Sequence, residues 1–546
     1  MRTARRTWSV RIALIICLML EYPMGGVAEP PHDVCSLEPP PIMELSVPDT
    51  AVPDESLSPS PWVHVPPVFI FPRLGDFFIP PSGPGYYSLQ DWLWGNRRPK
   101  PPIFPYPPFS LKAFPFYDAD FRYLERPDNT QHDLFDVVKR MHPGDNWLVS
   151  NGGEYRLRYM NEVDSRLTAR NNEYMLYRYI LYGDFWYRDQ FRLFVEFLRA
   201  DSCGEELTPL VIDVDSGGFV DLFIDWKLFE WGGKNAYVRI GRQELLYGSE
   251  RLISPLEWVN TLRTFQGVRV WRQGHHWDID MFWVRPVIPD PVRFNSVDRD
   301  QSFAGIWTTY RPRPGWFNDW YYLNRDFARP AFVGEYGARG GFNVSTLGTR
   351  TVGDYQNVLW DVELMLQFGK HVNQQIWAGA TSSGLGYRFA RLPFNAQFWL
   401  YYDWASGDSN PGVGNTFGTF NQLFPFGHYY LGFLDLVGRQ NIRDANCQFV
   451  CYPTKWLIFL AQYHRFFLDQ PKSPLFTAGG VPIRRDPTGR AGRDVGHELD
   501  LLVNIHIDAH QDVLIGYSKL FAGEFIRQTG PNVSPELFYI QYQFRW

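Results

Sequence analysis

The sequence predicts an all-β protein, a transmembrane antiparallel β-barrel of roughly 16 to 18 strands that follows a Pro-rich, mostly unstructured segment. Three observations predict this fold. Residues 536–546 form an amphipathic strand, and a period-two pattern recurs from Gly152 onward. Aromatic residues make up 17% of the chain, yet its mean hydropathy is only -0.29. Barrels of outer membranes have this composition, because a polar lumen dilutes an apolar outer belt and its aromatic girdles.

The C-terminal strand carries the strongest of these patterns. From residue 538 onward one parity holds only apolar and aromatic residues, namely Phe538, Ile540, Tyr542, Phe544 and Trp546. Successive side chains of a strand point to opposite faces, so this strand has one apolar face that continues to the last residue. Such an edge would promote aggregation in a soluble sheet, whereas a barrel closed in a membrane removes the edge. The alternative is an ordinary amphipathic strand of a soluble protein.

Residues 1–28 have the features of an export signal peptide. Four arginines, Arg2, Arg5, Arg6 and Arg11, precede the apolar run 12–20, and small residues then lead to Ala28, after which we expect cleavage. The apolar run is too short to span a bilayer as a helix. We therefore expect an exported protein that crosses a membrane only with strands.

Residues 29–118 are rich in proline, which cannot donate to a sheet ladder, and we expect them to be extended or disordered. Aromatic residues in this segment, including Trp92 and Trp94, suggest that parts of it dock elsewhere. Residues 119–150 lead into the barrel. They include a predicted short helix from Gln131 to Met141, where apolar residues recur at helical spacing.

Residues 151–546 are predicted to form the barrel. Apolar and polar residues alternate in segments that Gly, Pro, Asn and Asp separate: 154–159, 190–197, 236–240, 276–283, 358–367, 394–403 and 498–508. Parity alone does not distinguish a soluble sandwich, with its charged face in bulk water, from a barrel with a charged lumen. The number of segments favours the barrel, because a two-layer sandwich of that size is rare as one domain.

Composition and motifs exclude several classes of function. The formal net charge is -6, so no overall basic field indicates nucleic acid as a partner. The chain has five cysteines, too few for a disulfide scaffold, although Cys447 and Cys451 are spaced to pair in an oxidising compartment. We find no nucleophile motif and no set of scattered Ser, His and Asp residues that forms a triad. We expect no catalytic residue, no metal and no cofactor.

Arginines on the wet faces of the predicted strands are the candidate solute-binding residues. Transport of an anionic polymer needs cations spaced along a wet pore. The arginines with this parity are Arg156, Arg158, Arg192, Arg239 and Arg269. The same faces also carry acidic residues such as Asp278 and Asp361. The alternative is therefore that these arginines form structural ion networks in the lumen.

One block of the sequence resembles the alginate-export (alginate porin) family of bacterial outer-membrane barrels. A strand ending in Gly-Arg-Gln and a Tyr-Gly turn are followed by Trp-x-Asn and Arg-Thr-Phe-x-Gly-Val-Arg, which correspond to residues 241–243, 247–248, 258–260 and 263–269. Residues 152–159 resemble the first strand of that family, and residues 428–435 with 441–442 resemble a later strand. The resemblance covers about residues 150–546. It departs from the family at Leu262, which separates the Trp-x-Asn element from Arg263.

The resemblance implies a barrel of roughly 18 strands whose Arg-rich constriction passes an anionic polysaccharide. Arg242 and Arg263, which belong to the matching block, are the strongest candidates for that constriction. The implied partners are outer-membrane lipid, the saccharide, and the barrel-assembly machinery, which would read the strand ending at Trp546. The functional prediction is a channel of the outer membrane that has no catalytic activity. An outer-membrane enzyme and a soluble secreted all-β binding protein are the alternatives.

Overall fold

The computed structural model describes residues 81–106, 115–313 and 315–546, which belong to one compact unit. The predicted signal peptide and most of the Pro-rich segment lie outside the described residues. No helix in the described part of the chain is long and apolar enough to cross a membrane.

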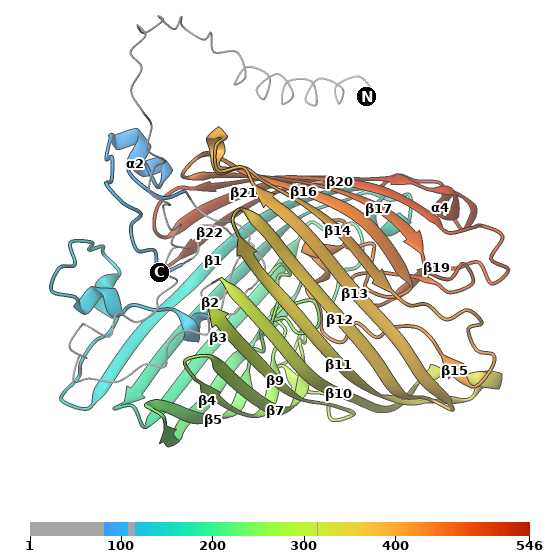
Figure 1. Cartoon of the computed structure of the whole chain (residues 1–546), viewed down its shortest axis with the longest axis horizontal. Coiled ribbons are helices and arrows are strands. Elements are labelled where there is room, and N and C mark those ends of the chain that lie inside the picture. Colours follow the sequence, from blue (N-terminus) through green and yellow to red (C-terminus); the bar gives the residue numbers. More distant parts are fainter. Residues whose placement is uncertain (1–80, 107–114, 314) are drawn as a thin grey trace, which may run out of the picture. The chain divides into compact units, whose positions relative to one another are not determined.

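One sheet of 20 strands dominates the described chain, and it has 18 strands without the two-residue strands β8 and β15 (Figure 1). The long strands pair with their neighbours in antiparallel fashion. Their bounds are β1 Trp147–Val163, β2 Asn172–Tyr187, β3 Phe191–Cys203, β4 Asp215–Trp231, β5 Lys234–Gln243, β6 Phe265–Gln273, β7 Trp277–Ile288, β9 Gln301–Arg313, β10 Trp316–Val333, β11 Arg339–Tyr355, β12 Val358–His371, β13 Gln374–Arg388, β14 Gln397–Ala405, β16 Ile442–Thr454, β17 Leu457–Leu468, β20 Asp494–His506, β21 Gln511–Ala522 and β22 Glu536–Arg545.

The remaining elements are short. The small strands are β8 Ser296–Val297, β15 Thr416–Phe417, β18 Leu475–Phe476 and β19 Pro482–Arg484. The α-helices are α2 Leu89–Trp94, α3 Gly427–Tyr430 and α4 Glu524–Gln528. The 3-10 turns are η1 Phe116–Asp118, η2 Arg122–Glu125, η3 Asp136–Val138, η4 Ser165–Leu167, η5 Glu335–Gly337 and η6 Pro393–Asn395.

The sheet closes where β1 meets β22. Glu154 lies opposite Arg545 in the register. Beyond that pair, Gly153 N donates to Trp546 O at 3.0 Å, and Trp546 N donates to Gly153 O at 3.1 Å. The first and last strands therefore seal a cylinder. This closure confirms the predicted barrel and excludes the two-layer sandwich.

The two faces of the wall follow the predicted parity. On β22 the side chain of Ile540 is 41% exposed on the outer face, while Tyr539 is 0% exposed on the inner face. Gln541 and Gln543 share the inner face with Tyr539 and are also buried. The prediction that the C-terminal strand has an apolar outer face is confirmed.

The two rims of the barrel differ. The C-terminus lies at one rim, on the left in Figure 1, and that rim carries tight turns such as 188–190, 232–233 and 455–456. The opposite rim carries α4 and longer connections, including residues 406–441 and 469–493. We call these the short-turn rim and the long-loop rim.

Residues 81–106, which belong to the Pro-rich segment, contain one short helix, α2. The side chain of Ser88 caps this helix by accepting a hydrogen bond from Asp91 N at 2.9 Å, and Gly95 ends it with φ 69°. Ser and Gly at these two positions satisfy the end groups of a helix. Gln90 N also donates to Ile507 O at 3.0 Å, so the segment is attached to the short-turn rim.

The predicted helix from Gln131 to Met141 is wrong, because the structure has only the 3-10 turn η3 in that region. Leu134 and Val137, two of its apolar residues, are 79% and 73% exposed. Without a surface to pack against, an amphipathic pattern of this length does not stabilise a helix. The segment is instead attached through His510, whose Nε2 lies 2.8 Å from Asp133 Oδ2.

The suggested pairing of Cys447 with Cys451 is also wrong. Both residues lie on β16 with their thiols free. Four residues of a strand span about 13 Å, whereas a disulfide needs Cα atoms within about 7 Å of each other. Because the segment is an extended strand, the two thiols cannot meet.

Replacement of an outer-face residue tests the lipid-facing wall. We expect Ile540→Arg to lower the free energy of unfolding by about 2 to 4 kcal/mol, because an arginine near the middle of the bilayer is costly on this face. The measurement is guanidinium unfolding of the protein refolded into lipid vesicles. The control Ile540→Val should cost no more than about 1.5 kcal/mol. Equal costs for the two variants would contradict an outer face in contact with lipid.

The contact at His510 predicts a pH dependence. Burial lowers the pKa of His510, but the hydrogen bonds to Asp133 and to Arg545 O outweigh it and leave this pKa raised above its usual value. The contact is therefore fully stabilising below about pH 6.5, the unfolded pKa, and is lost as pH rises through the higher folded pKa.

We expect His510→Gln to cost about 0.5 kcal/mol more at pH 6 than at pH 8.5, a small value because solvent screens this rim. The measurement is the free energy of unfolding of both proteins at each pH. A cost that is the same at both pH values would show that His510 carries no charge in the folded protein.

Candidate functional site in the lumen

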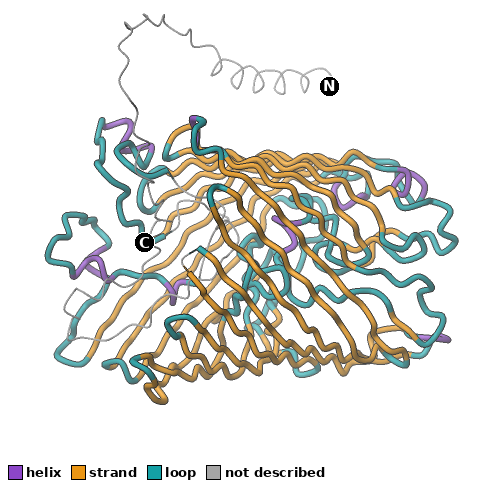
Figure 2. Tube along the Cα trace, viewed as in Figure 1, coloured by secondary structure: helices purple, strands orange, loops and turns teal. Residues whose placement is uncertain are grey.

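Two connections of the long-loop rim fold into the barrel. Loop A, residues 244–264, joins β5 to β6, and loop B, residues 406–441, joins β14 to β16. Leu245 and Ile253 of loop A and Phe420 and Phe433 of loop B are all 0% exposed. They belong to one apolar core with inward side chains of the wall. Figure 2 shows these loop segments in teal within the ring of strands.

The two loops are joined by backbone hydrogen bonds. Ile253 and Phe424 form a parallel bridge. Around it, Ser254 N donates to Phe424 O at 3.0 Å, Phe424 N donates to Leu252 O at 2.9 Å, and Phe426 N donates to Glu250 O at 2.8 Å. Loops A and B therefore form one inner structure whose polar backbone groups are satisfied away from water.

Arg263 holds this junction together. Its Nη1 donates to Phe424 O at 2.5 Å, to Pro425 O at 3.1 Å and to Ser254 O at 3.2 Å. Burial and the neighbouring charge of Arg325 lower the pKa of Arg263 to about 9, so the guanidinium remains charged at pH 7. The sequence-based prediction assigned Arg263 to the constriction; in the structure its side chain links loop A to loop B.

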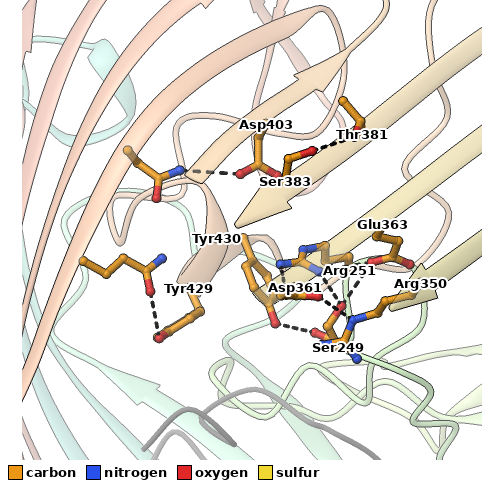
Figure 3. A network of polar contacts seen from close by, with 12 residues as sticks. Ser249, Arg251, Arg350, Asp361, Glu363, Thr381, Ser383, Asp403, Tyr429 and Tyr430 are labelled. Atoms are coloured by element: carbon orange, nitrogen blue, oxygen red, sulfur yellow. Dashed lines mark hydrogen bonds and ion pairs between the residues drawn. The ribbon is translucent and has the colours of Figure 1, made fainter. Parts of the chain in front are cut away.

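A second arginine of loop A ties the inner structure to the wall (Figure 3). Arg251 Nη2 donates to Asp361 Oδ2 at 2.6 Å, and Arg251 Nη1 donates to Glu363 Oε2 at 3.2 Å. Arg350 Nε donates to the other oxygen of Asp361 at 2.7 Å. Tyr430 of loop B donates to Ser249 O of loop A at 2.6 Å, so both loops share this anchor on β12.

Three of the predicted lumen arginines form ion pairs with acidic residues of the wall. Arg239 makes two hydrogen bonds to Asp225, at 2.7 and 2.9 Å. Arg269 Nη2 lies 2.6 Å from Asp280 Oδ2. Arg192 Nε lies 2.7 Å from Asp184 Oδ1. These pairs join strands within the wall, as the alternative interpretation of a structural ion network expected.

Arg156 and Arg158 on β1 contact loop A instead. Arg156 Nη1 donates to Glu257 O at 2.9 Å, and its Nη2 donates to Val259 O. The guanidinium of Arg158 stacks 3.7 Å from the ring centre of Trp258, while its Nε donates to Gln541 Oε1 at 2.8 Å. The Trp-x-Asn motif of the sequence therefore contacts the wall at the closure seam.

Arg242 lies on the opposite parity of β5 from Arg239. Its neighbour Ile240 on that parity is 57% exposed on the outer face. Arg242 Nη1 donates to Phe219 O at 2.8 Å near the long-loop rim. The structure thus separates Arg242 from the inward-facing arginines and from Arg263.

Arg325 on β10 was not predicted from the sequence, although it shares the inward parity with the buried Leu323. It donates to Leu423 O at 3.0 Å, and its guanidinium lies 4.3 Å from the ring centre of Phe424. Arg263 lies 5.7 Å from the same ring. Among the described residues, neither arginine forms an ion pair with a carboxylate. Two partly exposed cations therefore flank Phe424.

The N-terminal segment 115–125 also enters the lumen. Tyr117 packs against Phe194 and Phe223 on the inner wall, and its hydroxyl donates to Glu244 O at 3.1 Å. Arg192 Nη2 donates to Tyr117 O at 2.7 Å. Upstream, Tyr106 OH donates to Trp546 O at 2.8 Å at the short-turn rim. Apart from the aromatic residues of the segment, no pattern in the sequence predicted this insertion.

Residues 428–435, which resembled a strand, belong to loop B. Residues 427–433 are all buried and do not alternate, and α3 covers the first part. His428 stacks on Trp258 with ring centres 3.7 Å apart. The absence of alternation in 427–433 was the feature that distinguished a packed loop from a strand.

Comparisons with known proteins agree with this architecture. A family model described as alginate export matches residues 148–540. The barrel is similar to the Pseudomonas aeruginosa structure OccD3 (OpdP), with 13% sequence identity and a TM-score of 0.48, over 72% of this chain and 91% of that chain. It is also similar to OpdQ from the same organism, with 11% identity and a TM-score of 0.49, over 73% of this chain and 97% of that chain. The outer membrane protein OprD of P. aeruginosa is similar with 9% identity and a TM-score of 0.45, over 72% of this chain and 94% of that chain. No curated protein matched the chain.

Removal of the Arg251 anchor tests the attachment of the inner loops. Arg251→Ala leaves Asp361 and Glu363 buried with less compensation, and breaking a buried ion pair costs about 3 to 5 kcal/mol. We expect a lower free energy of unfolding and larger current fluctuations in single-channel recordings.

The matched control is Arg199→Ala, which removes an exposed pair with Asp201 on the outer wall. This variant should change the free energy of unfolding by less than about 1 kcal/mol. Equal effects of the two substitutions would contradict the proposed anchor.

Proposed function

The chain belongs to the alginate export family, and we propose that the solute of its outer-membrane barrel is an anionic polysaccharide or a related anion. The barrel and the family support a channel of the porin type, and the proposal includes no catalytic step. Arg263 and Arg325 are the side chains that we assign to the solute path.

The observation that carries the proposal is the pair of cations beside Phe424. Most lumen arginines are neutralised by nearby acids, as with Arg239 and Asp225. Arg263 and Arg325 instead donate to carbonyl groups and an amide, so their positive charge is not cancelled by an ion pair. A polyuronate chain carries one carboxylate on each sugar, and two partly exposed guanidinium groups attract such groups without holding them in a deep pocket.

The difference between the two rims supports one orientation of the barrel in the membrane. Barrels of this class have short periplasmic turns and longer extracellular loops. We therefore assign the short-turn rim to the periplasm and loops A and B to the outer side. The segment 115–125 then enters from the periplasmic side, downstream of the proposed signal peptide 1–28. We also propose that the assembly machinery reads β22 and the final Trp546.

Ion selectivity in planar bilayers tests the function. We expect the wild-type channel to prefer chloride to potassium in a salt gradient. Arg263→Gln and Arg325→Gln should each lower this preference roughly fivefold, because a unit charge a few ångströms from a wet path contributes about 1 kcal/mol. Addition of a soluble polyuronate oligomer should block the current of the wild type more strongly than that of the double variant.

Arg199→Gln is the matched control, since Arg199 lies on the outer wall in an exposed pair. It should leave the selectivity unchanged. A wild-type channel that prefers cations would contradict the proposed anionic solute, whatever the variants do.

A further inference from the structure

Three buried carboxylates meet inside the lumen, where the wall joins the root of loop A. Glu196 on β3, Asp221 on β4 and Glu244 at the start of loop A form this group, which we call the acidic triad. One oxygen from each lies within 4.8 Å of the others. Their exposed fractions are 1%, 0% and 3%. The register places Glu196 directly opposite Asp221, so backbone pairing fixes the first two.

The acidic triad lacks the partners that buried charges require. Neither carboxylate oxygen of Glu196 accepts a hydrogen bond, and Asp221 Oδ2 also has no partner in the described structure. No ion pair joins any of the three residues to an arginine or lysine of the described chain. The nearby Arg178 is instead engaged by Glu154, with 2.6 Å between Arg178 Nη2 and Glu154 Oε1. An uncompensated buried carboxylate is very costly, so this site needs either bound protons or a further positive group.

A neutral side chain beside the acidic triad, that of Gln243, also lacks hydrogen-bond partners. Leu222 pairs with Arg242 in the register, which places Gln243 beside Asp221 on the inner face. Gln243 is 0% exposed, and neither its amide oxygen nor its amide nitrogen has a hydrogen-bond partner. A buried amide with both groups unpaired is rare, and an amide oxygen is a neutral ligand that a hard cation accepts.

A small cavity adjoins two members of the acidic triad. This cavity of about 20 Å³ is lined by Glu196 and Glu244, by Phe116 of the inserted N-terminal segment, and by Arg545, which forms an ion pair with Asp512. A polar cavity of this size is large enough for one water molecule. Shared protons would draw the carboxylate oxygens into short hydrogen bonds, but no such bond joins Glu196 to another group. Oxygens bound to one calcium ion at 2.3 to 2.6 Å lie up to about 5 Å apart, which matches the acidic triad.

We propose that the acidic triad binds one Ca²⁺ ion, with the Gln243 amide oxygen and a water molecule in the cavity completing its coordination. The donor atoms are all oxygens, which hard cations prefer, and the set has no His or Cys ligand. An irregular set drawn from three chain segments suits the flexible coordination of calcium better than the strict octahedron of magnesium.

The ion would fasten the inner loops to the wall. Asp221 Oδ1 already accepts a hydrogen bond from Glu244 N at 2.9 Å, so the root of loop A lies against β4. Tyr117 donates to the carbonyl of the same Glu244. A calcium ion bound there joins β3, β4, loop A and the inserted segment through one point. This role differs from solute passage, and it goes beyond the proposed function.

Calcium titration of the full-length protein tests the site. The protein is refolded in a non-ionic detergent with EGTA and then titrated with CaCl₂ in a calorimeter and in thermal melts. We expect one Ca²⁺ per chain and a higher Tm with calcium. Glu196→Gln keeps the shape of the side chain but removes a charged calcium ligand. Loss of a residue that merely supports a metal ligand weakens metal binding roughly 10- to 100-fold, and we expect this variant to weaken calcium binding at least as much.

Thermal melts of the same variant give a second measurement that does not depend on calorimetry. In EGTA, Glu196→Gln should melt at a higher temperature than the wild type, because it removes repulsion within the acidic triad. In saturating calcium this order should reverse. Glu498→Gln is the matched control, since Glu498 is another fully buried wall carboxylate, on β20, and it should leave calcium binding unchanged.

Three results would overturn the proposal. They are the absence of calcium binding by the wild type, equal binding by Glu196→Gln, and a Tm that responds to Mg²⁺ but not to Ca²⁺. A Tm that depends on pH and not on calcium would likewise show that protons neutralise the acidic triad.

Discussion

The structure depends on one constraint: lipid offers no hydrogen-bond partner to the backbone of the wall. Every strand must therefore pair on both sides, and a chain of strands meets this requirement only by closing on itself. The two hydrogen bonds between Gly153 and Trp546 complete that closure. This closure also explains the alternation of apolar and polar residues on β22. The outer face of β22 has to remain apolar up to its pairing with β1, while its inner face remains polar.

Closure creates an interior that has to be filled or hydrated, and this chain fills much of it. Loops A and B bring an apolar core into the lumen, and the wall meets that core with aromatic side chains such as Trp307 and Tyr321. Charged residues of the wall then lie away from bulk water. Pairs such as Arg239 with Asp225 and Arg251 with Asp361 compensate one another, because an unpaired charge at such a depth would be too costly.

Two groups of charged residues in the lumen lack such ion pairs. The cations Arg263 and Arg325 lie on the partly exposed side of the loop junction, whereas the acidic triad lies buried at the root of loop A. We have proposed that the first set attracts a passing anion and that the second set binds a resident cation. The same physical requirement, that charge be balanced according to its access to water, distinguishes the two sites.

The strands of the wall could be predicted from the sequence alone. Period-two alternation and the parity of Phe538 to Trp546 are local properties of a strand, so they predicted the barrel, its outer face and the strand that closes it. The resemblance in residues 241–269 also singled out Arg263, whose side chain hydrogen-bonds to loop B; its place at a constriction stays a prediction. The contacts between distant segments could be seen only in the folded chain: Arg325 beside Arg263, Tyr117 inside the lumen, and the meeting of Glu196, Asp221 and Glu244. These contacts depend on strand register and on how loops fold back, and no local pattern of residues records either of them.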